Sequence, residues 1–310
     1  MSRAKVFKNI DEQISILESK GLEIPEKEYA KIVLLKENYF FLSGYRHIFM
    51  KQNKDTKFLA GTTFNELYTM FLFDRRIRNI FFKNILVIEN NIKSLISYQL
   101  SKKYGFKERD YLNPNNFTKD PMRERQVSDI IEKMKRQIRV NGQKHSATIH
   151  YLSNYGYIPL WILVKVLSFG ITSELYTILK SEDQDEIALF YKLDSSTLSI
   201  FLSVLANYRN LCAHEDILFD HKTQKTIPNN KYHYLLKLPQ VEDEYICGKN
   251  DLFAVVLIFK HMLSRREFNS FADEINKELD ELKANIKVLT PDILLNKIGF
   301  PDNWLLLKEL

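Results

Sequence analysis

The chain is poor in the two residues that most often interrupt regular secondary structure. It has 9 Gly and 8 Pro in 310 residues, too few for the frequent turns of an all-β protein. It also has only two cysteines, Cys212 and Cys247. One disulfide is possible, but their neighbours suggest small buried side chains in a reducing compartment. The composition therefore favours long helices over sheets.

Signals for export, membrane insertion and cofactor binding are also missing. No apolar stretch follows the amino terminus as in a signal peptide. The longest fully apolar run, Leu252 to Phe259, is far shorter than the ~20 residues that span a bilayer. No glycine-rich loop suggests a nucleotide cofactor, and no Cys/His spacing resembles a zinc site. We therefore expect a soluble, cytoplasmic protein with no metal, no cofactor and no membrane contact.

The chain is rich in apolar and basic residues. Hydrophobic residues make up 45% of it, and 45 Lys and Arg against 39 Asp and Glu give a net charge of +6. This mild excess does not identify a nucleic-acid partner. The basic residues gather at 75–83 and at 121–144, which solvated helix faces can explain. The same clusters offer candidate RNA-binding residues, namely Arg75, Arg76, Arg78, Lys83, Arg136 and Arg139.

Apolar residues recur every three or four positions over most of the chain, which predicts helices. The longest predicted helix runs from about Phe64 to Lys102 and begins with Thr63 and Glu66 in a capping-box pattern. A second, strongly apolar helix follows a cap at 194–197. Further helices are expected at 9–20, from Pro25 onward, and at 122–139, 160–179 with a break at 168–170, 251–264 and 270–287. Turns or loops are expected at 40–45, 51–61, 105–120, 219–240 and 299–304.

The sequence Arg209-Asn210-Leu211-Cys212-Ala213-His214 ends this second helix. A guanidinium binds phosphate with paired donors, and an imidazole transfers protons near neutral pH. RNA carries its own nucleophile, the 2′-hydroxyl. Such a pair can therefore stabilise the strained phosphorane and supply an acid or a base without a metal. Two copies related by a two-fold axis would supply both.

Spacing alone is a weak signal for such a site. Arg139 and His145 form a second pair of this kind across an expected turn, which we interpret as a coincidence. Five helical positions separate Arg209 from His214 by ~140° around the axis, whereas Asn210 and His214 share a face. We expect the helix to loosen near His214 and a cleft between two facing helices to collect all three side chains. An exposed arginine beside a capping histidine is the simpler alternative.

Four aromatic residues can also be considered as surfaces for base stacking. All four lie on predicted apolar helix faces, so we expect them in the core; they are Trp161, Phe169, Phe201 and Tyr208.

Five blocks of sequence occur in a fixed order: YFFLSGY at 39–45, TTFNELYTMFLFDRRIR at 62–78, PLWILVKVLSFG at 159–170, YRNLCAH at 208–214 and GFPDNW at 299–304. Together they resemble the abortive-infection (Abi-like, AbiD/AbiF) family of bacterial phage-defence proteins. The resemblance implies an all-α fold with a HEPN-type helical core, a kind that cleaves RNA in several toxin and CRISPR-linked ribonucleases. We expect an N-terminal helical region at 1–62, a HEPN-like core at 63–268 and a C-terminal helical tail at 269–310 that packs on the core.

The same resemblance matches Arg209 and His214 to the family's arginine and histidine, and Asn210 to the polar residue that often follows the arginine. It implies metal-independent cleavage that leaves a 2′,3′-cyclic phosphate and a 5′-hydroxyl. It also implies a homodimer with a composite cleft. Some relatives resemble toxins restrained by a small RNA partner, which suggests the same partner here.

The chain departs from the family pattern at two positions. Lys165 stands where relatives usually have a glutamate, and Lys93 stands where an arginine is common. Neither change touches the proposed chemistry. Glu89, which the family keeps, can be a buried carboxylate that orients the site, but a helix-face ion pair with Lys93 is the simpler interpretation.

The leading hypothesis is an RNA-cleaving toxin of phage defence, and three alternatives stay open. A non-catalytic RNA-binding module would use Arg209 and the basic clusters to hold backbone phosphates. A phage-sensing interaction module would use the aromatic N-terminal region. Nucleotidyl or adenylyl modification, with Tyr208 as an acceptor, is more remote.

Overall fold

The computed structural model describes residues 6–50 and 57–310. Within these residues the chain forms 15 α-helices, four short 3-10 helices and one antiparallel hairpin, which confirms an all-α fold. The α-helices are α1 (Ile10–Ser19), α2 (Lys27–Glu37), α3 (Tyr39–Gly44), α4 (Phe64–Tyr104), α5 (Glu108–Tyr111), α6 (Glu124–Asn141), α7 (Ser146–Tyr155), α8 (Leu160–Val166), α9 (Phe169–Ile178), α10 (Ser181–Phe190), α11 (Ser195–Ala213), α12 (Lys231–Leu235), α13 (Leu252–Met262), α14 (Arg265–Asn285) and α15 (Pro291–Ile298). The 3-10 helices are η1 (Tyr45–Phe49), η2 (Pro114–Asn116), η3 (Pro121–Arg123) and η4 (Trp304–Lys308), and the hairpin pairs β1 (Gln240–Val241) with β2 (Glu244–Tyr245).

The described residues divide into two compact units. Unit 1 contains the chain up to Ile80, the segment Glu215–His221 and the segment Asn269–Leu310. Unit 2 contains Phe81–His214 and Lys222–Phe268. The expected division into 1–62, 63–268 and 269–310 stays a prediction, and the unit boundary at 268/269 falls inside α14. The others fall inside α4 and on either side of 215–221, where the sequence gives no break in composition.

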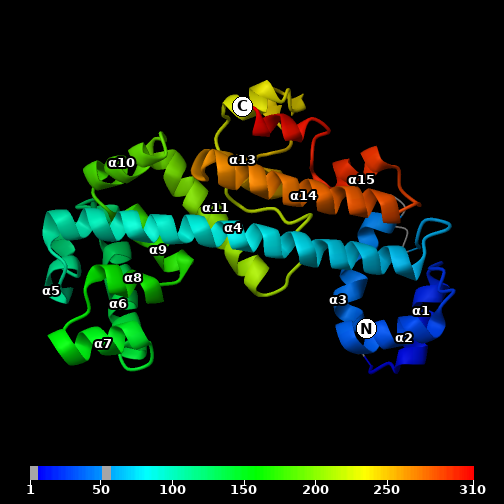
Figure 1. Cartoon of the computed structure of the whole chain (residues 1–310), viewed down its shortest axis with the longest axis horizontal. Coiled ribbons are helices and arrows are strands. Elements are labelled where there is room, and N and C mark those ends of the chain that lie inside the picture. The colour runs from blue at the N-terminus through cyan, green and yellow to red at the C-terminus, as the bar shows by residue number, and fades with distance from the viewer. Residues whose placement is uncertain (1–5, 51–56) are drawn as a thin grey trace. The chain divides into compact units, whose positions relative to one another are not determined.

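The long predicted helix is α4, which runs without interruption through 41 residues (Figure 1). Its first turn carries the expected capping box. The Glu66 N–H donates to Thr63 Oγ1 at 3.2 Å, and the Thr63 N–H donates to Glu66 Oε2 at 3.0 Å. One apolar face is at most 1% exposed along nearly the whole helix, at Phe73, Ile77, Phe81, Ile85, Ile88, Ile92 and Ile96. Packing of this face, rather than helix propensity, explains the stability of so long a helix.

Unit 1 holds most of α14 alongside the first part of α4 (Figure 1). Arg76 of α4 pairs with Glu278 and Glu281 of α14. The aromatic turn near the C-terminus is anchored, as the sequence suggested: Trp304 is 3% exposed, and its ring meets Phe300 edge-on at 5.2 Å.

Unit 2 is built around apolar helices. α9 packs against α11, and α6 packs against α8 and α9. The longest apolar run of the sequence, Leu252 to Phe259, lies in α13 and is fully buried. Both Cys212 and Cys247 are free thiols. Among the described residues no single helix is both long and apolar enough to cross a membrane. The helices α10 and α11 together reach that length and apolar composition, but they are bent by 73° at the break between them.

Several short elements differ from the sequence prediction. Residues 40–45, expected as a turn, form α3 and the start of η1, because Asn38 Oδ1 accepts the Phe40 N–H and begins a helix. The helices α7, α10 and α15 were not predicted, and α5 and α12 lie inside expected loops. Part of the loop expected at 51–61 falls on residues 51–56, outside the described residues.

One expectation about the core is wrong. Phe169, Phe201 and Tyr208 are buried as predicted, but Trp161 is 42% exposed. α8 has only seven residues, so its apolar sequence does not require burial on all sides, and Trp161 lies on the side that faces solvent.

Candidate functional site

α11 carries the Arg209–His214 motif at its C-terminal end. Asp194 caps the start of this helix and accepts the Thr197 N–H at 2.7 Å. Side-chain hydrogen bonds from Ser196 and Thr197 hold the pKa of Asp194 at about 2. The face toward the core is buried at Leu198, Phe201, Leu202, Leu205, Tyr208 and Cys212. A capped and packed helix therefore fixes the backbone from which the motif projects.

The helix ends at the motif's histidine, which confirms the expected loosening there. The His214 N–H donates to the Asn210 carbonyl at 3.0 Å, and His214 has φ −98° and ψ 5°. Glu215 follows with φ 58°, the left-handed conformation that often ends a helix. The imidazole of His214 is exposed at this turn.

Arg209 is anchored by Glu89 of α4. Its Nε donates to Glu89 Oε2 at 3.4 Å, and its Cζ lies 5.7 Å from the centroid of the Phe82 ring. Glu89 is 4% exposed, whereas the Arg209 side chain is 29% exposed. Among residues 6–50 and 57–310, the hydrogen bond of Arg209 to Glu89 uses only Nε. The Nη1 and Nη2 groups therefore keep their N–H donors for an anion.

Glu89 is buried, and it forms the helix-face ion pair with Lys93 that the sequence predicts. Its Oε1 accepts from Lys93 Nζ at 2.6 Å, one helical turn along α4. Its other oxygen faces Arg209, so one buried carboxylate serves two cations. The three groups carry a formal charge of +1, which favours an approaching phosphate.

The side chain of Arg209 contacts Glu89 rather than the other two residues of the motif. The side chains of Asn210 and His214 are exposed. Within the described residues, no hydrogen bond or ion pair joins either side chain to Arg209. A substrate phosphate or a second chain would therefore have to bridge the arginine and the histidine.

Three of the candidate RNA-binding residues lie in unit 1, where each has a protein partner. Arg75 makes two hydrogen bonds to Glu37, at 3.0 and 2.6 Å. Arg76 pairs with the two glutamates of α14. Arg78 is only 3% exposed. Phosphate binding by these residues would have to compete with their present partners.

The other three candidates, Lys83, Arg136 and Arg139, are exposed in unit 2. Arg136 and Arg139 line a shallow hollow of about 350 Å³ on α6, together with Asp129, Glu132 and Lys133. Their side chains are positioned to meet an anion from solvent.

The segment that follows the motif is fixed within unit 1 by Asp74, a residue that the sequence did not single out. Asp74 is fully buried and accepts the N–H groups of Leu218 at 3.1 Å and Phe219 at 2.9 Å. It also accepts the Tyr45 hydroxyl at 2.8 Å. Burial raises the pKa of Asp74 to about 6, although Arg78 and these hydrogen bonds oppose the rise. An acidic residue amid buried aromatic positions of α4 is the signal that could have revealed it.

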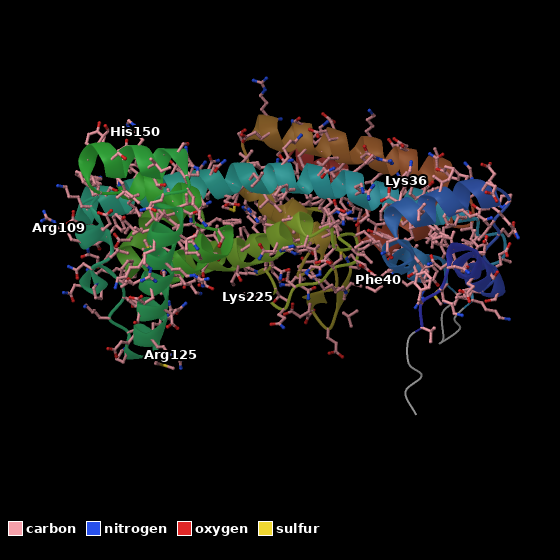
Figure 2. The ribbon with its side chains drawn as sticks, turned by 90° about the horizontal axis from the view of Figure 1, so that it is seen from below. Lys36, Phe40, Arg109, Arg125, His150 and Lys225 are labelled. Carbon is pink, nitrogen blue, oxygen red and sulfur yellow. The ribbon has the colours of Figure 1, made fainter. Side chains whose placement is uncertain are left out.

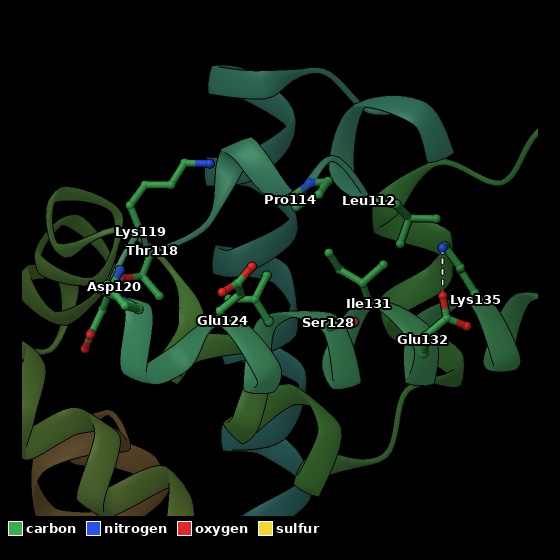
Figure 3. A pocket seen from close by; sticks show the side chains of 12 residues that line it. Leu112, Pro114, Thr118, Lys119, Asp120, Glu124, Ser128, Ile131, Glu132 and Lys135 are labelled. Atoms are coloured by element: carbon green, nitrogen blue, oxygen red, sulfur yellow. Dashed lines mark hydrogen bonds and ion pairs between the residues drawn. The ribbon is translucent and has the colours of Figure 1, made fainter.

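A separate pocket of about 540 Å³ lies in unit 2 between the 112–121 segment and α6 (Figure 3). Asp120 and Lys119 stand at one end, while Glu132 and Lys135 form an ion pair at the other. Its charged lining consists of three carboxylates and two lysines. No motif residue lines it, and its excess of carboxylates disfavours a phosphate.

The comparisons with known proteins agree with the resemblance seen in the sequence. The family model described as Abi-like protein matches residues 32–220, more than half of the chain. The matched region includes α4, α11 and the Arg209–His214 motif. Curated proteins and solved structures give no significant match. The chain therefore belongs to the Abi-like protein family and is an abortive-infection protein.

Proposed function

We propose that this abortive-infection protein is a metal-independent endoribonuclease with a HEPN-type site. Arg209 binds the scissile phosphate, His214 acts as a general acid or base, and Asn210 orients the phosphate or the imidazole. One observation carries the proposal: an arginine anchored through Nε by a buried carboxylate lies five residues before an exposed histidine at a helix end.

The chemistry needs two proton transfers at one ribose-phosphate linkage. A base takes the proton of the 2′-hydroxyl, the O2′–P bond forms, and the P–O5′ bond breaks as an acid protonates the leaving oxygen. The products are a 2′,3′-cyclic phosphate and a 5′-hydroxyl. The Nη donors of Arg209 stabilise the negative oxygens of the phosphorane.

A homodimer follows from this requirement, because one motif supplies one histidine. The second chain's copy provides the other proton transfer. A small RNA that restrains the protein would act by occupying the same guanidinium donors, so that substrate and inhibitor compete for one surface.

A non-catalytic RNA-binding module is the second candidate. The exposed Arg136 and Arg139 favour it, since both can bind phosphate without any contribution from the motif. Such a module binds RNA with a steep salt dependence and releases no product. Modification at Tyr208 is disfavoured because this side chain is fully buried.

The test is incubation of purified protein with total RNA in EDTA, followed by analysis of the new ends. Wild type is expected to release 2′,3′-cyclic phosphate and 5′-hydroxyl ends. His214→Ala is expected to lose about 10²- to 10⁴-fold in rate, and Arg209→Lys to lose about 10²-fold or more. Both variants should keep the wild-type circular dichroism spectrum.

The second Arg–His pair provides a matched control. His145 caps α7 by accepting the Ala147 N–H, and His145→Asn keeps a capping side chain. This variant should cleave RNA at the wild-type rate. Full activity in His214→Ala, or equal losses in both histidine variants, would reject the assignment of His214.

A further inference from the structure

A group of aromatic side chains on α7, α8 and the turn before α5 forms a continuous surface row in unit 2. Neighbouring ring centroids are 5.4 Å apart for Trp161 and Phe106, and 5.9 Å apart for Phe106 and Tyr157. The row continues through Tyr155, with centroids 6.4 Å from Tyr157 and 5.4 Å from Tyr151. We call this set the aromatic ladder; its members are Trp161, Phe106, Tyr157, Tyr155, Tyr151 and His150.

The local backbone explains why these rings share one surface. Tyr151 and Tyr155 are four positions apart on α7, so they lie on one helix face. Gly156 then ends α7 in the left-handed conformation, with φ 76°. This turn carries Tyr157 back beside Tyr155, and α8 begins after Pro159 with Trp161 in its first turn.

Four of the six ladder residues are exposed, and Tyr151 and Tyr157 are half-buried. Tyr155 is 58% exposed, Trp161 is 42% exposed and Phe106 is 36% exposed. Contiguous exposed apolar side chains commonly mark a binding surface. Figure 2 shows His150 projecting outward from α7 and Arg109 projecting outward from α5 in the same unit.

The charges around the ladder favour a polyanion. The helices α7 and α8 contain no Asp or Glu, and Lys165 of α8 is exposed. Lys107 Nζ lies 4.8 Å from the centroid of the Tyr157 ring. The carboxylates on α5 already have partners, since Glu108 accepts the Ile158 N–H and Asp110 accepts the Lys107 N–H.

We infer that the aromatic ladder is a stacking surface for unpaired RNA, separate from the Arg209–His214 motif. Aromatic faces beside cations bind single strands, because each exposed base has a face that can stack and each nucleotide carries a phosphate. A duplex hides those faces. The inference rests on the proposed function for RNA as the partner, but it does not depend on cleavage. It specifies that the RNA bound here is single-stranded.

Tryptophan fluorescence gives a direct test. The chain has two tryptophans; Trp161 is exposed in the ladder, and Trp304 is 3% exposed. Full-length protein is titrated with a 12-nucleotide 2′-O-methyl oligonucleotide, which lacks the 2′-hydroxyl nucleophile and cannot be cleaved by the proposed reaction. Stacking on Trp161 should quench the fluorescence. The Trp161→Phe variant, which keeps only Trp304, should show no quenching.

Affinity measured by fluorescence anisotropy of a labelled oligonucleotide extends the test. Trp161→Ala and Tyr155→Ala should each weaken binding about 5- to 100-fold, the range for loss of one stacked base. The matched control is Tyr234→Ala on α12, because Tyr234 is 76% exposed and is not part of the ladder. This control should bind as wild type does. A duplex of the same length should bind more weakly than the single strand.

Unchanged affinity in both ladder variants, or tighter binding of the duplex, would overturn the inference. Binding by wild type that is insensitive to salt would also contradict it. If ladder variants instead change the sedimentation of the protein without changing RNA affinity, the ladder is a protein interface and the inference is wrong. Because the probe cannot be cleaved, these outcomes are independent of whether His214 is catalytic.

Discussion

Two buried carboxylates on α4 have different kinds of partner. Asp74, in unit 1, accepts hydrogen bonds from two backbone amides and a tyrosine hydroxyl. Glu89, in unit 2, accepts from the side chains of Lys93 and Arg209. The first fixes the path of a segment of chain, and the second holds the arginine of the candidate site in place. The same type of residue on the same helix therefore serves structure in one unit and the candidate site in the other.

The difference has an energetic basis. The hydrogen-bond donors to Asp74 are neutral, and the cation near it, Arg78, lies 3.7 Å away. Much of the cost of burying this carboxylate therefore remains, which is why its pKa is raised to about 6. Two cations around Glu89 offset the cost of burial there, provided that all three groups are present. Removal of either carboxylate should therefore have distinguishable consequences.

The largest effect is expected from Glu89→Gln. The change leaves Lys93 buried without its counter-ion and removes the charged acceptor from Arg209. Loss of one partner from a buried ion pair costs about 3–5 kcal/mol. Urea unfolding monitored by circular dichroism measures the loss. The double variant Glu89→Gln with Lys93→Met should recover much of it, and a single variant as stable as wild type would contradict the comparison.

An effect nearly as large is expected from Asp74→Ala, which also removes the carboxylate that lies 3.7 Å from the buried Arg78. It leaves the amides of Leu218 and Phe219 without their acceptor, and each unsatisfied buried group costs about 1–3 kcal/mol. Hydrogen exchange of these two amides should become faster, while amides of α11 keep their wild-type protection. Equal protection of residues 218 and 219 in wild type and variant would show that Asp74 does not fix this segment.

The pH dependence of stability sharpens the same comparison. The pKa of Asp74 is about 6 in the folded chain, against an ordinary value of 3.8. The folded state therefore keeps a proton that the unfolded state releases, so this contribution to stability is complete below about pH 4 and is lost as pH rises through about 6. Relative to Asp74→Asn, which does not titrate, wild type should lose stability between about pH 4 and 6. Urea midpoints at four pH values test this, and parallel curves would contradict it.

The smallest effect is expected from Arg75→Ala. Arg75 pairs with Glu37 in unit 1 much as Arg209 pairs with Glu89 in unit 2, but the Arg75 and Glu37 side chains are 34% and 18% exposed. Solvent weakens such a pair, so the loss should be about 1 kcal/mol or less. Thermal unfolding in low and high salt measures it. A loss as large as that of Glu89→Gln would remove the distinction between solvated and buried pairs.

Much of the fold could be predicted from sequence, because its signals are local. The capping box at Thr63 and Glu66 and the apolar periodicity that follows predict α4 almost to its ends. Asp194 predicts the start of α11 in the same way. The short helices α7, α10 and α15 were missed, since ten residues or fewer give too little periodicity to distinguish a helix from a loop.

The candidate site was predicted in part. The residues of the motif and its place at the end of α11 follow from the sequence. The exposure of Trp161 does not, because an apolar helix of seven residues gives no indication of which side faces solvent. The role of Asp74 was also missed, because the two amides that it binds lie 144 and 145 positions away in the chain.

The sequence by itself determined that this protein is helical, where its main helices begin, and that its motif stands at a helix end, since caps and periodicity act between residues a few positions apart. Only the tertiary structure decided that Glu89 meets Arg209 across 120 positions and leaves its Nη donors available. Such pairing depends on how helices pack, and packing is set by the whole buried surface rather than by neighbouring residues.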